Sequence, residues 1–85
     1  MHEVRPGQLW ADNDARAEGR TLRVDRIAGD YAVCTVLTNS ALNQAALDEG
    51  KSWARDMRGR PATILLRRFR PGRSGYTLIK EAEDA

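Results

Sequence analysis

The fold is decided by the stretch Arg20-Thr-Leu-Arg-Val-Asp-Arg-Ile27, the loop Ala28-Gly29-Asp30 and the stretch Tyr31-Ala-Val-Cys-Thr-Val-Leu-Thr38. Leu22 and Val24 alternate with charged residues, which is the period-2 pattern of a half-buried strand. Ile27 breaks this alternation, and the break predicts either a β-bulge near residues 25–26 or the end of the strand. Gly29 tolerates the backbone of a tight turn, so the chain is expected to return as a second strand and form an antiparallel hairpin.

The second strand of this hairpin is apolar on both of its faces. Tyr31, Val33 and Leu37 share one parity, while Ala32, Cys34 and Val36 share the other. A strand that is apolar on both parities is typical of a central strand covered on both sides, and we expect that position here.

Three further short strands flank the hairpin. They are predicted at residues 8–10, 61–66 and 75–80, with Pro6-Gly7 and the run 67–74 as turns. Trp10 is expected in the core, and Phe69 is expected to turn inward as the one apolar residue of its turn. Five short strands with turns between them indicate a small closed or nearly closed antiparallel barrel, because closure removes the edges that so short a chain cannot shield.

Residues 39–60 are too long for a simple hairpin loop. Apolar spacing predicts a two-turn helix from about Ser40 to Glu49, with Asn39 or Ser40 as its cap and Gly50 at its end. We therefore expect one domain over residues 1–85, with a helical insertion at 39–60 between the third and fourth strands and a flexible acidic tail at 81–85.

The composition argues against several classes of function. The 85 residues include one cysteine and one histidine, His2, so neither a zinc site nor a catalytic Cys/His or Ser/His/Asp group can be assembled. No metal, cofactor or enzymatic activity is therefore expected, and Cys34 is interpreted as a small core residue. The start lacks the apolar run of a signal peptide and no later stretch could span a membrane, so we expect a soluble, cytoplasmic protein without membrane contact.

Charge is distributed unevenly along the chain. The net charge is only +2, but seven arginines face a single acidic residue, Asp56, between residues 55 and 73. The acidic tail partly offsets this run. The arginines are Arg55, Arg58, Arg60, Arg67, Arg68, Arg70 and Arg73.

Three interpretations of the arginine run remain open. Arginine pairs bidentately with phosphate and stacks on bases, so the run indicates nucleic-acid contact, with the charges converging at one end of the barrel and with Trp53 and Tyr76 as stacking surfaces. The run is also consistent with a solvated surface that prevents aggregation, or with a docking patch for an acidic protein partner. Trp53, which follows the helix, is a candidate contact residue or interface anchor.

Several motifs together resemble a known family. They are Val4-Arg5-Pro6-Gly7-Gln8-Leu9-Trp10, Asp12 and Asp14, Gly19-Arg20-Thr21-Leu22-Arg23-Val24, Arg67-Arg68-Phe69-Arg70 and Gly75-Tyr76-Thr77-Leu78-Ile79. The sequence resembles a family of short uncharacterised proteins of high-GC Gram-positive bacteria and their bacteriophages. This resemblance implies a small SH3-like barrel, but it implies no activity. The insertion at 39–60 departs from the shorter members.

The sequence thus favours a non-enzymatic binding module that contacts nucleic-acid phosphates through its arginine-rich face, with little or no sequence preference. The alternative is a phage or host regulatory adaptor that binds a protein partner through the insertion and Trp53, with a homodimer as one form.

Overall fold

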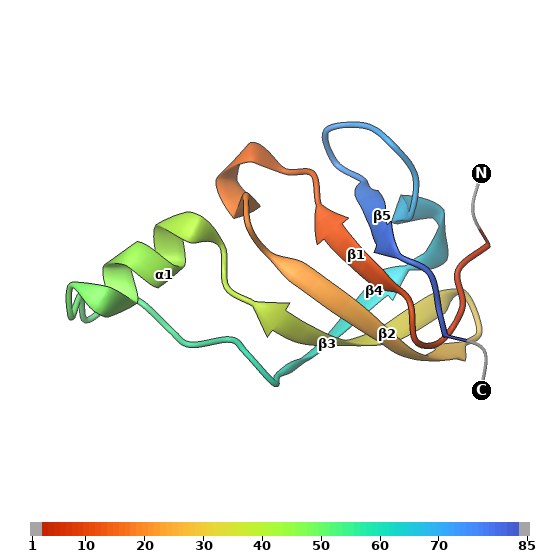
Figure 1. Cartoon of the computed structure of the whole chain (residues 1–85), viewed down its shortest axis with the longest axis horizontal. Helices are drawn as coiled ribbons and strands as arrows, with labels where there is room; N and C mark the ends of the chain where they lie inside the picture. The colour runs from red at the N-terminus through yellow and green to blue at the C-terminus, as the bar shows by residue number, and fades with distance from the viewer. Residues whose placement is uncertain (1–2, 84–85) are drawn as a thin grey trace.

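The computed structural model describes residues 3–83, and His2 and the last two residues of the expected tail lie outside them (Figure 1). Five antiparallel strands form one sheet, accompanied by one α-helix and two short 3-10 helices. The elements in chain order are β1 (Leu9–Asp12), η1 (Ala15–Ala17), β2 (Thr21–Ala28), β3 (Tyr31–Thr38), α1 (Ala41–Asp48), β4 (Pro61–Leu65), η2 (Leu66–Arg68) and β5 (Tyr76–Lys80).

The predicted hairpin is confirmed. β2 and β3 pair in antiparallel fashion, and the turn between them contains Gly29, which adopts a left-handed φ of 59°. Their register shifts between Val24 and Arg26, so the expected bulge is present and explains why Ile27 leaves the alternation. The other strands lie within two residues of their predicted bounds, and Leu66 begins η2 instead of continuing β4.

The sheet is not closed by hydrogen bonds. Its strand order is β4-β3-β2-β1-β5, so β4 and β5 are edge strands and the expected closed barrel is not confirmed. β3 is an interior strand, as predicted, but only its Ala32, Cys34 and Val36 side is buried; Val33 and Leu37 are half-exposed. The expectation that β3 is covered on both faces is therefore wrong, because no second layer of the described chain packs on that outer face.

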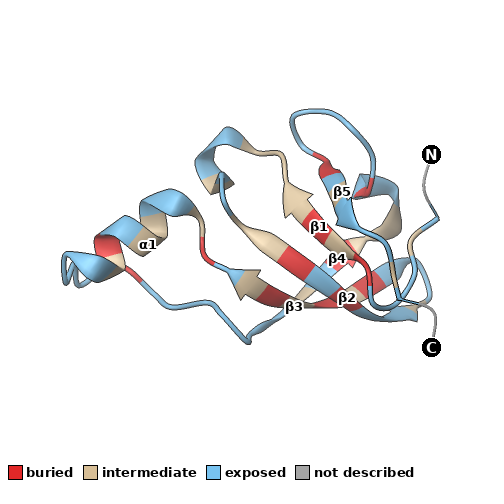
Figure 2. Ribbon diagram, in the orientation of Figure 1, coloured by how far each residue is buried: buried red, intermediate tan, exposed pale blue. Residues whose placement is uncertain are grey.

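Aromatic packing covers the inner face of the sheet. Phe69 lies directly after η2 and contacts Trp10 of β1 edge to face, with ring centroids 5.1 Å apart, and it stacks on Tyr76 of β5 at 5.2 Å. The chain that leaves one edge strand thus crosses to the strands at the other edge. The inner face is the buried region seen on the strands in Figure 2. The buried core residues are Trp10, Leu22, Val24, Ala32, Cys34, Val36, Ile64, Phe69 and Tyr76.

In the loop before β5, residue 75 lies so close to the backbone of Arg70 that only glycine fits there. A Cβ added at Gly75 would lie 1.8 Å from the carbonyl oxygen of Arg70. The same carbonyl accepts the amide of Tyr76 at 3.1 Å, so the loop is held against the start of β5.

The described segments before β1 and after β5 are tied together through one buried side chain, that of Gln8. Gln8 accepts the backbone N–H of Arg5 at 2.8 Å and the indole N–H of Trp10 at 3.1 Å, and its amide donates to Glu81 at 2.7 Å. Glu81 also forms an ion pair with Arg5 at 3.0 Å, and Glu83 forms one with Lys80. The two described glutamates of the acidic tail thus each lie beside a cation.

The insertion projects from one end of the sheet, beyond the end of β3 (Figure 1). The predicted helix is confirmed as α1, with Ser40 as the cap accepting the amide of Asn43 at 3.2 Å and with Gly50 just beyond its end at a φ of 74°. Ala46 is the buried residue of the helix, while Leu42 is 68% exposed. The predicted apolar face therefore packs only in part.

Truncation of Phe69 should strongly destabilise the fold. Phe69→Ala removes the contact that joins η2 to β1 and β5, and we expect it to lower the free energy of unfolding by about 3–5 kcal/mol. This is a large share of the ~4–13 kcal/mol expected for a domain of this size. Urea unfolding followed by circular dichroism measures the loss, and Phe69→Leu serves as the control with a smaller effect. A loss below about 1 kcal/mol for Phe69→Ala would show that the ring does not hold the sheet.

Cys34 should react with thiol reagents only when the domain opens. Its side chain is fully buried in β3, and burial, followed by the negative charge of Asp25, raises the pKa of the thiol to about 11. At pH 8 we expect native labelling to be far slower than labelling of the urea-unfolded chain, with a rate that rises as Phe69→Ala destabilises the domain. Rapid labelling of the native wild-type protein would contradict this burial.

Candidate functional site

The seven arginines of the sequence run do not converge. Arg60 precedes β4 and its carbonyl accepts the amide of Val36 at 2.9 Å, whereas Arg67 and Arg68 lie in η2 at the other end of β4. The five residues of β4, at roughly 3.3 Å per residue, separate these groups by about 17 Å. The expectation of one cationic end is therefore wrong, because an extended strand lies in the middle of the run.

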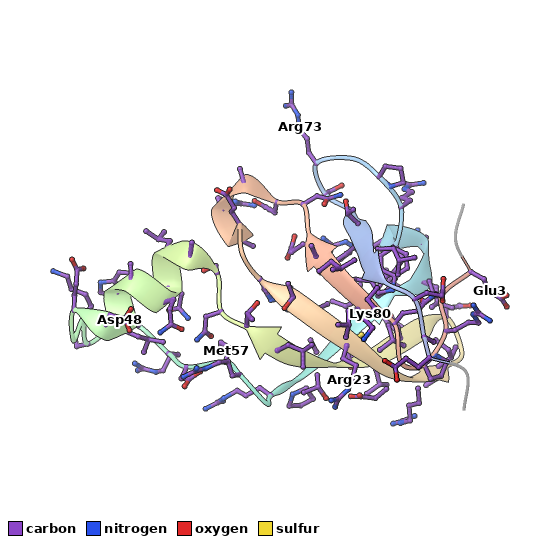
Figure 3. The ribbon with its side chains drawn as sticks, viewed as in Figure 1. Glu3, Arg23, Asp48, Met57, Arg73 and Lys80 are labelled. Carbon is purple, nitrogen blue, oxygen red and sulfur yellow. The ribbon has the colours of Figure 1, made fainter. Side chains whose placement is uncertain are left out.

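Figure 3 shows two of the segments that carry the run. Arg73 extends into solvent from the loop before β5, while Met57 lies on the segment that returns from α1. Arg55 and Arg58 belong to that returning segment, and Arg70 belongs to the loop that carries Arg73.

Most basic residues outside this run are neutralised in pairs. Within residues 3–83, Lys80 and four arginines outside the run each lie within 4.0 Å of a carboxylate. The Arg16 guanidinium lowers the pKa of Asp14 to about 2 through the hydrogen bonds it makes with that carboxylate. The pairs are Arg5–Glu81, Arg16–Asp14, Arg20–Asp12, Arg23–Asp25 and Lys80–Glu83.

The run itself behaves differently. Arg58 pairs with Asp56 at 2.7 Å and holds the pKa of that carboxyl well below its usual range, but no other arginine of the run has a carboxylate partner among the described residues. Arg68 donates to the carbonyl of Ser74 at 2.9 Å. The side chains of Arg60, Arg67, Arg70 and Arg73 form no hydrogen bond or ion pair within residues 3–83, and this set is called the unpaired arginines below.

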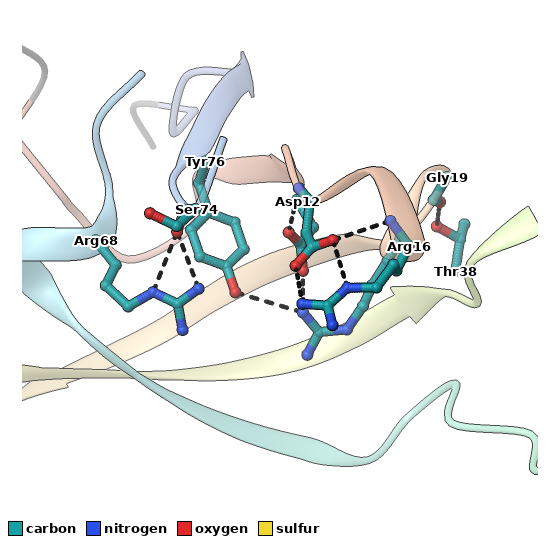
Figure 4. A network of polar contacts seen from close by, with 9 residues as sticks. Asp12, Arg16, Gly19, Thr38, Arg68, Ser74 and Tyr76 are labelled. Carbon is teal, nitrogen blue, oxygen red and sulfur yellow. Dashed lines mark hydrogen bonds and ion pairs between the residues drawn. The ribbon is translucent and has the colours of Figure 1, made fainter. Parts of the chain in front are cut away.

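Tyr76 is not a stacking surface. It is only 2% exposed, its ring packs on Phe69, and the Arg68 guanidinium lies over it at 5.6 Å. The Tyr76 hydroxyl accepts from Arg20 at 3.4 Å, and Arg20 also pairs with Asp12 at 2.9 Å, as the network in Figure 4 shows. The expected stacking role of Tyr76 is therefore wrong, because its ring is buried against Phe69 and the Arg68 guanidinium.

Trp53, by contrast, is 61% exposed, as expected for a contact residue. It lines a groove of about 250 Å³ between the insertion and the end of the sheet. We call this groove the insertion groove below. Its lining residues are Arg20, Val36, Thr38, Asn39, Ser40, Asn43, Trp53, Arg55 and Met57.

Two asparagines fix the walls of this groove. Buried Asn39 accepts the amide of Met57 at 2.8 Å and donates to Asp56 at 3.1 Å, while Asn43 donates to the carbonyl of Arg55 at 2.6 Å. Sequence reasoning considered Asn39 only as a helix cap. Its bridging role had no local signal, since its partners lie 17 and 18 residues further along the chain.

Neither a metal-ligand cluster nor a membrane-spanning helix accompanies these surfaces in the described residues. In the described part of the chain, no three His, Cys, Asp or Glu residues are grouped to hold a metal ion. The same residues include no helix with the length and apolar character of a membrane span.

Comparison of the chain with family models, curated proteins and solved structures finds no match.

Loss of the Asn39 side chain should loosen the insertion without unfolding the sheet. Asn39→Ala removes its hydrogen bonds to Met57, Asp56 and Gln44, and we expect a loss of about 1–3 kcal/mol together with faster hydrogen exchange at the Met57 amide. Asn13→Ala is the control, because its amide bonds the carbonyl of Gly72, far from the insertion. Equal exchange at Met57 in both variants would contradict the pinning role of Asn39.

Proposed function

We propose that the protein is a non-enzymatic binding module that contacts nucleic-acid phosphates through its unpaired arginines. The observation that carries the proposal is the contrast in pairing: among the described residues, carboxylates pair with five of the seven basic residues outside the run, but leave Arg60, Arg67, Arg70 and Arg73 without partners. An exposed guanidinium without a carboxylate keeps its planar donor edge available for the two oxygens of a phosphate.

The placement of these arginines favours an extended ligand. Arg60 lies at one end of β4 and Arg67 at the other, with Arg70 and Arg73 on the loop that follows η2. Phosphates recur along a nucleic-acid strand, so separated cations can each contact one. A polymer of regular negative charge matches cations spread over about 17 Å better than a small anion does.

The finer form of the fold belongs to the same proposal. We infer an SH3-like barrel, supported by the β1 to β4 meander, the return of β5 to β1, and the 3-10 helix that carries Phe69 across the inner face. Membership in the family of high-GC bacteria and their bacteriophages rests on the motif resemblance, and action in the cytoplasm belongs to the same proposal.

A second candidate is an adaptor that binds a protein partner through the insertion, alone or as a homodimer. Its support is the apolar surface that the insertion exposes, with Leu42 at 68%, Trp53 at 61% and Met57 at 39%. The polar groups of the insertion groove and its lack of acidic lining make this candidate the second choice.

Replacement of unpaired arginines should weaken nucleic-acid binding and flatten its salt dependence. For the triple variant Arg67→Gln, Arg70→Gln and Arg73→Gln, we expect the slope of log K against log salt to fall by about 2 on a single strand, since each phosphate contact contributes about 0.7. Fluorescence anisotropy of a labelled oligonucleotide at several salt concentrations measures the slope.

The matched control is the triple variant Arg5→Gln, Arg16→Gln and Arg23→Gln, which removes the same charge from arginines that are already paired. If both triple variants weaken nucleic-acid binding equally, the loss is explained by net charge alone. Absence of wild-type binding at low salt would overturn the proposed function.

A further inference from the structure

Trp53 is presented on a loop that is held in place on both sides of the indole. The side chain of Asn43 accepts a hydrogen bond from the backbone N–H of Arg55 at 3.3 Å and donates one to the carbonyl of Arg55 at 2.6 Å. The backbone just after Trp53 is therefore fixed to α1. The Arg55 guanidinium donates to the carbonyls of Ser52 at 2.8 Å and Ala54 at 3.0 Å, which flank Trp53 in the chain. The indole is therefore an exposed ring on an ordered support.

The far end of this loop is tied to the sheet. The amide of Gly59 donates to the carbonyl of Val36 at 2.8 Å, and the amide of Val36 donates to the carbonyl of Arg60 at 2.9 Å. With Asn39 holding Met57, the loop has anchors on α1, on β3 and on the junction between them. An aromatic surface held in this way loses little conformational freedom when a ligand stacks on it.

The chemistry around the indole favours a ligand that is both flat and anionic. The insertion groove contains two arginines, Arg20 and Arg55, and no carboxylate. Asp12 pairs with Arg20, so Arg55 is the lining cation without a carboxylate partner among the described residues. The remainder of the lining combines apolar Val36 and Met57 with the polar side chains of Thr38, Asn39, Ser40 and Asn43.

An apolar peptide segment would leave the remaining N–H donors of the Arg55 guanidinium, which within residues 3–83 hydrogen-bonds only through one terminal nitrogen, facing apolar atoms, and this carries a desolvation cost. A nucleotide meets both requirements, because its base offers a π-face to the indole, edge atoms for hydrogen bonds and an adjoining phosphate for Arg55.

We propose that the insertion groove binds an unstacked base of a single-stranded nucleic acid, with the base on Trp53 and the neighbouring phosphate at Arg55. This inference rests on the proposed function and makes it more specific: the unpaired arginines follow the backbone, and the insertion groove selects single strands. A base inside a duplex has both faces occupied and cannot reach the indole.

The two tryptophans allow a direct test. Trp10 is 2% exposed and Trp53 is 61% exposed, so quenching of tryptophan emission by a bound base reports on Trp53. Titration with a twelve-nucleotide oligothymidine should quench this emission, and the matching oligothymidine–oligoadenine duplex should not. Anisotropy of the same labelled oligonucleotides gives the affinities at one fixed salt concentration.

Trp53→Ala should weaken single-strand binding by about tenfold and leave duplex binding unchanged, whereas Trp53→Phe should retain most of the affinity. Leu42→Ala is the matched control, since Leu42 is an equally exposed apolar side chain of the insertion outside the groove lining. Circular dichroism and thermal unfolding verify that all three variants fold.

The outcomes separate the two proposals. If wild-type protein binds neither oligonucleotide at low salt, the proposed function and this inference both fail. If binding occurs but Trp53→Ala behaves like Leu42→Ala, or if single-strand and duplex affinities fall equally, the proposed function stands and the stacking site is overturned.

Discussion

The contact of Phe69 with Trp10 and Tyr76 is the interaction on which the other features depend. β4 and β5 are the edges of an open sheet, so backbone hydrogen bonds alone would leave its inner face accessible to water. Because Phe69 follows η2 and packs on β1 and β5, the inner face is covered by side chains. The same contact buries Tyr76, and the Arg68 guanidinium lies over its ring, so the Tyr76 ring is not available to a stacked ligand.

The position of β4 decides how the arginines are presented. An extended strand placed inside a basic run divides it into two groups, one on the insertion and one on η2 and the loop after it. Carboxylates then neutralise much of the remaining positive charge, including Arg5 through the acidic tail. The cationic surface that remains is smaller than the sequence run and more extended, which suits a linear polyanion better than a compact one.

The insertion adds a second kind of surface. α1 packs only in part, yet Asn39 and Asn43 hold the loop that follows it and keep Trp53 exposed beside the insertion groove. These asparagines link the described insertion to itself and to the end of β3. A groove of this kind depends on side-chain hydrogen bonds between segments distant in sequence, and not on the strand pairing that builds the sheet.

The sequence by itself determined the local structure: the β2–β3 hairpin with its bulge, the capped helix α1, the buried positions of Trp10, Cys34 and Phe69, and the exposure of Trp53. Each of these follows from the spacing of apolar residues and from turn residues, which act over a few positions. Only the tertiary structure decided that the sheet stays open, that Tyr76 is buried and that Asn39 bridges the insertion. These features depend on contacts between segments far apart in the chain, and the spacing of residues within one segment carries no information about which distant partner it meets.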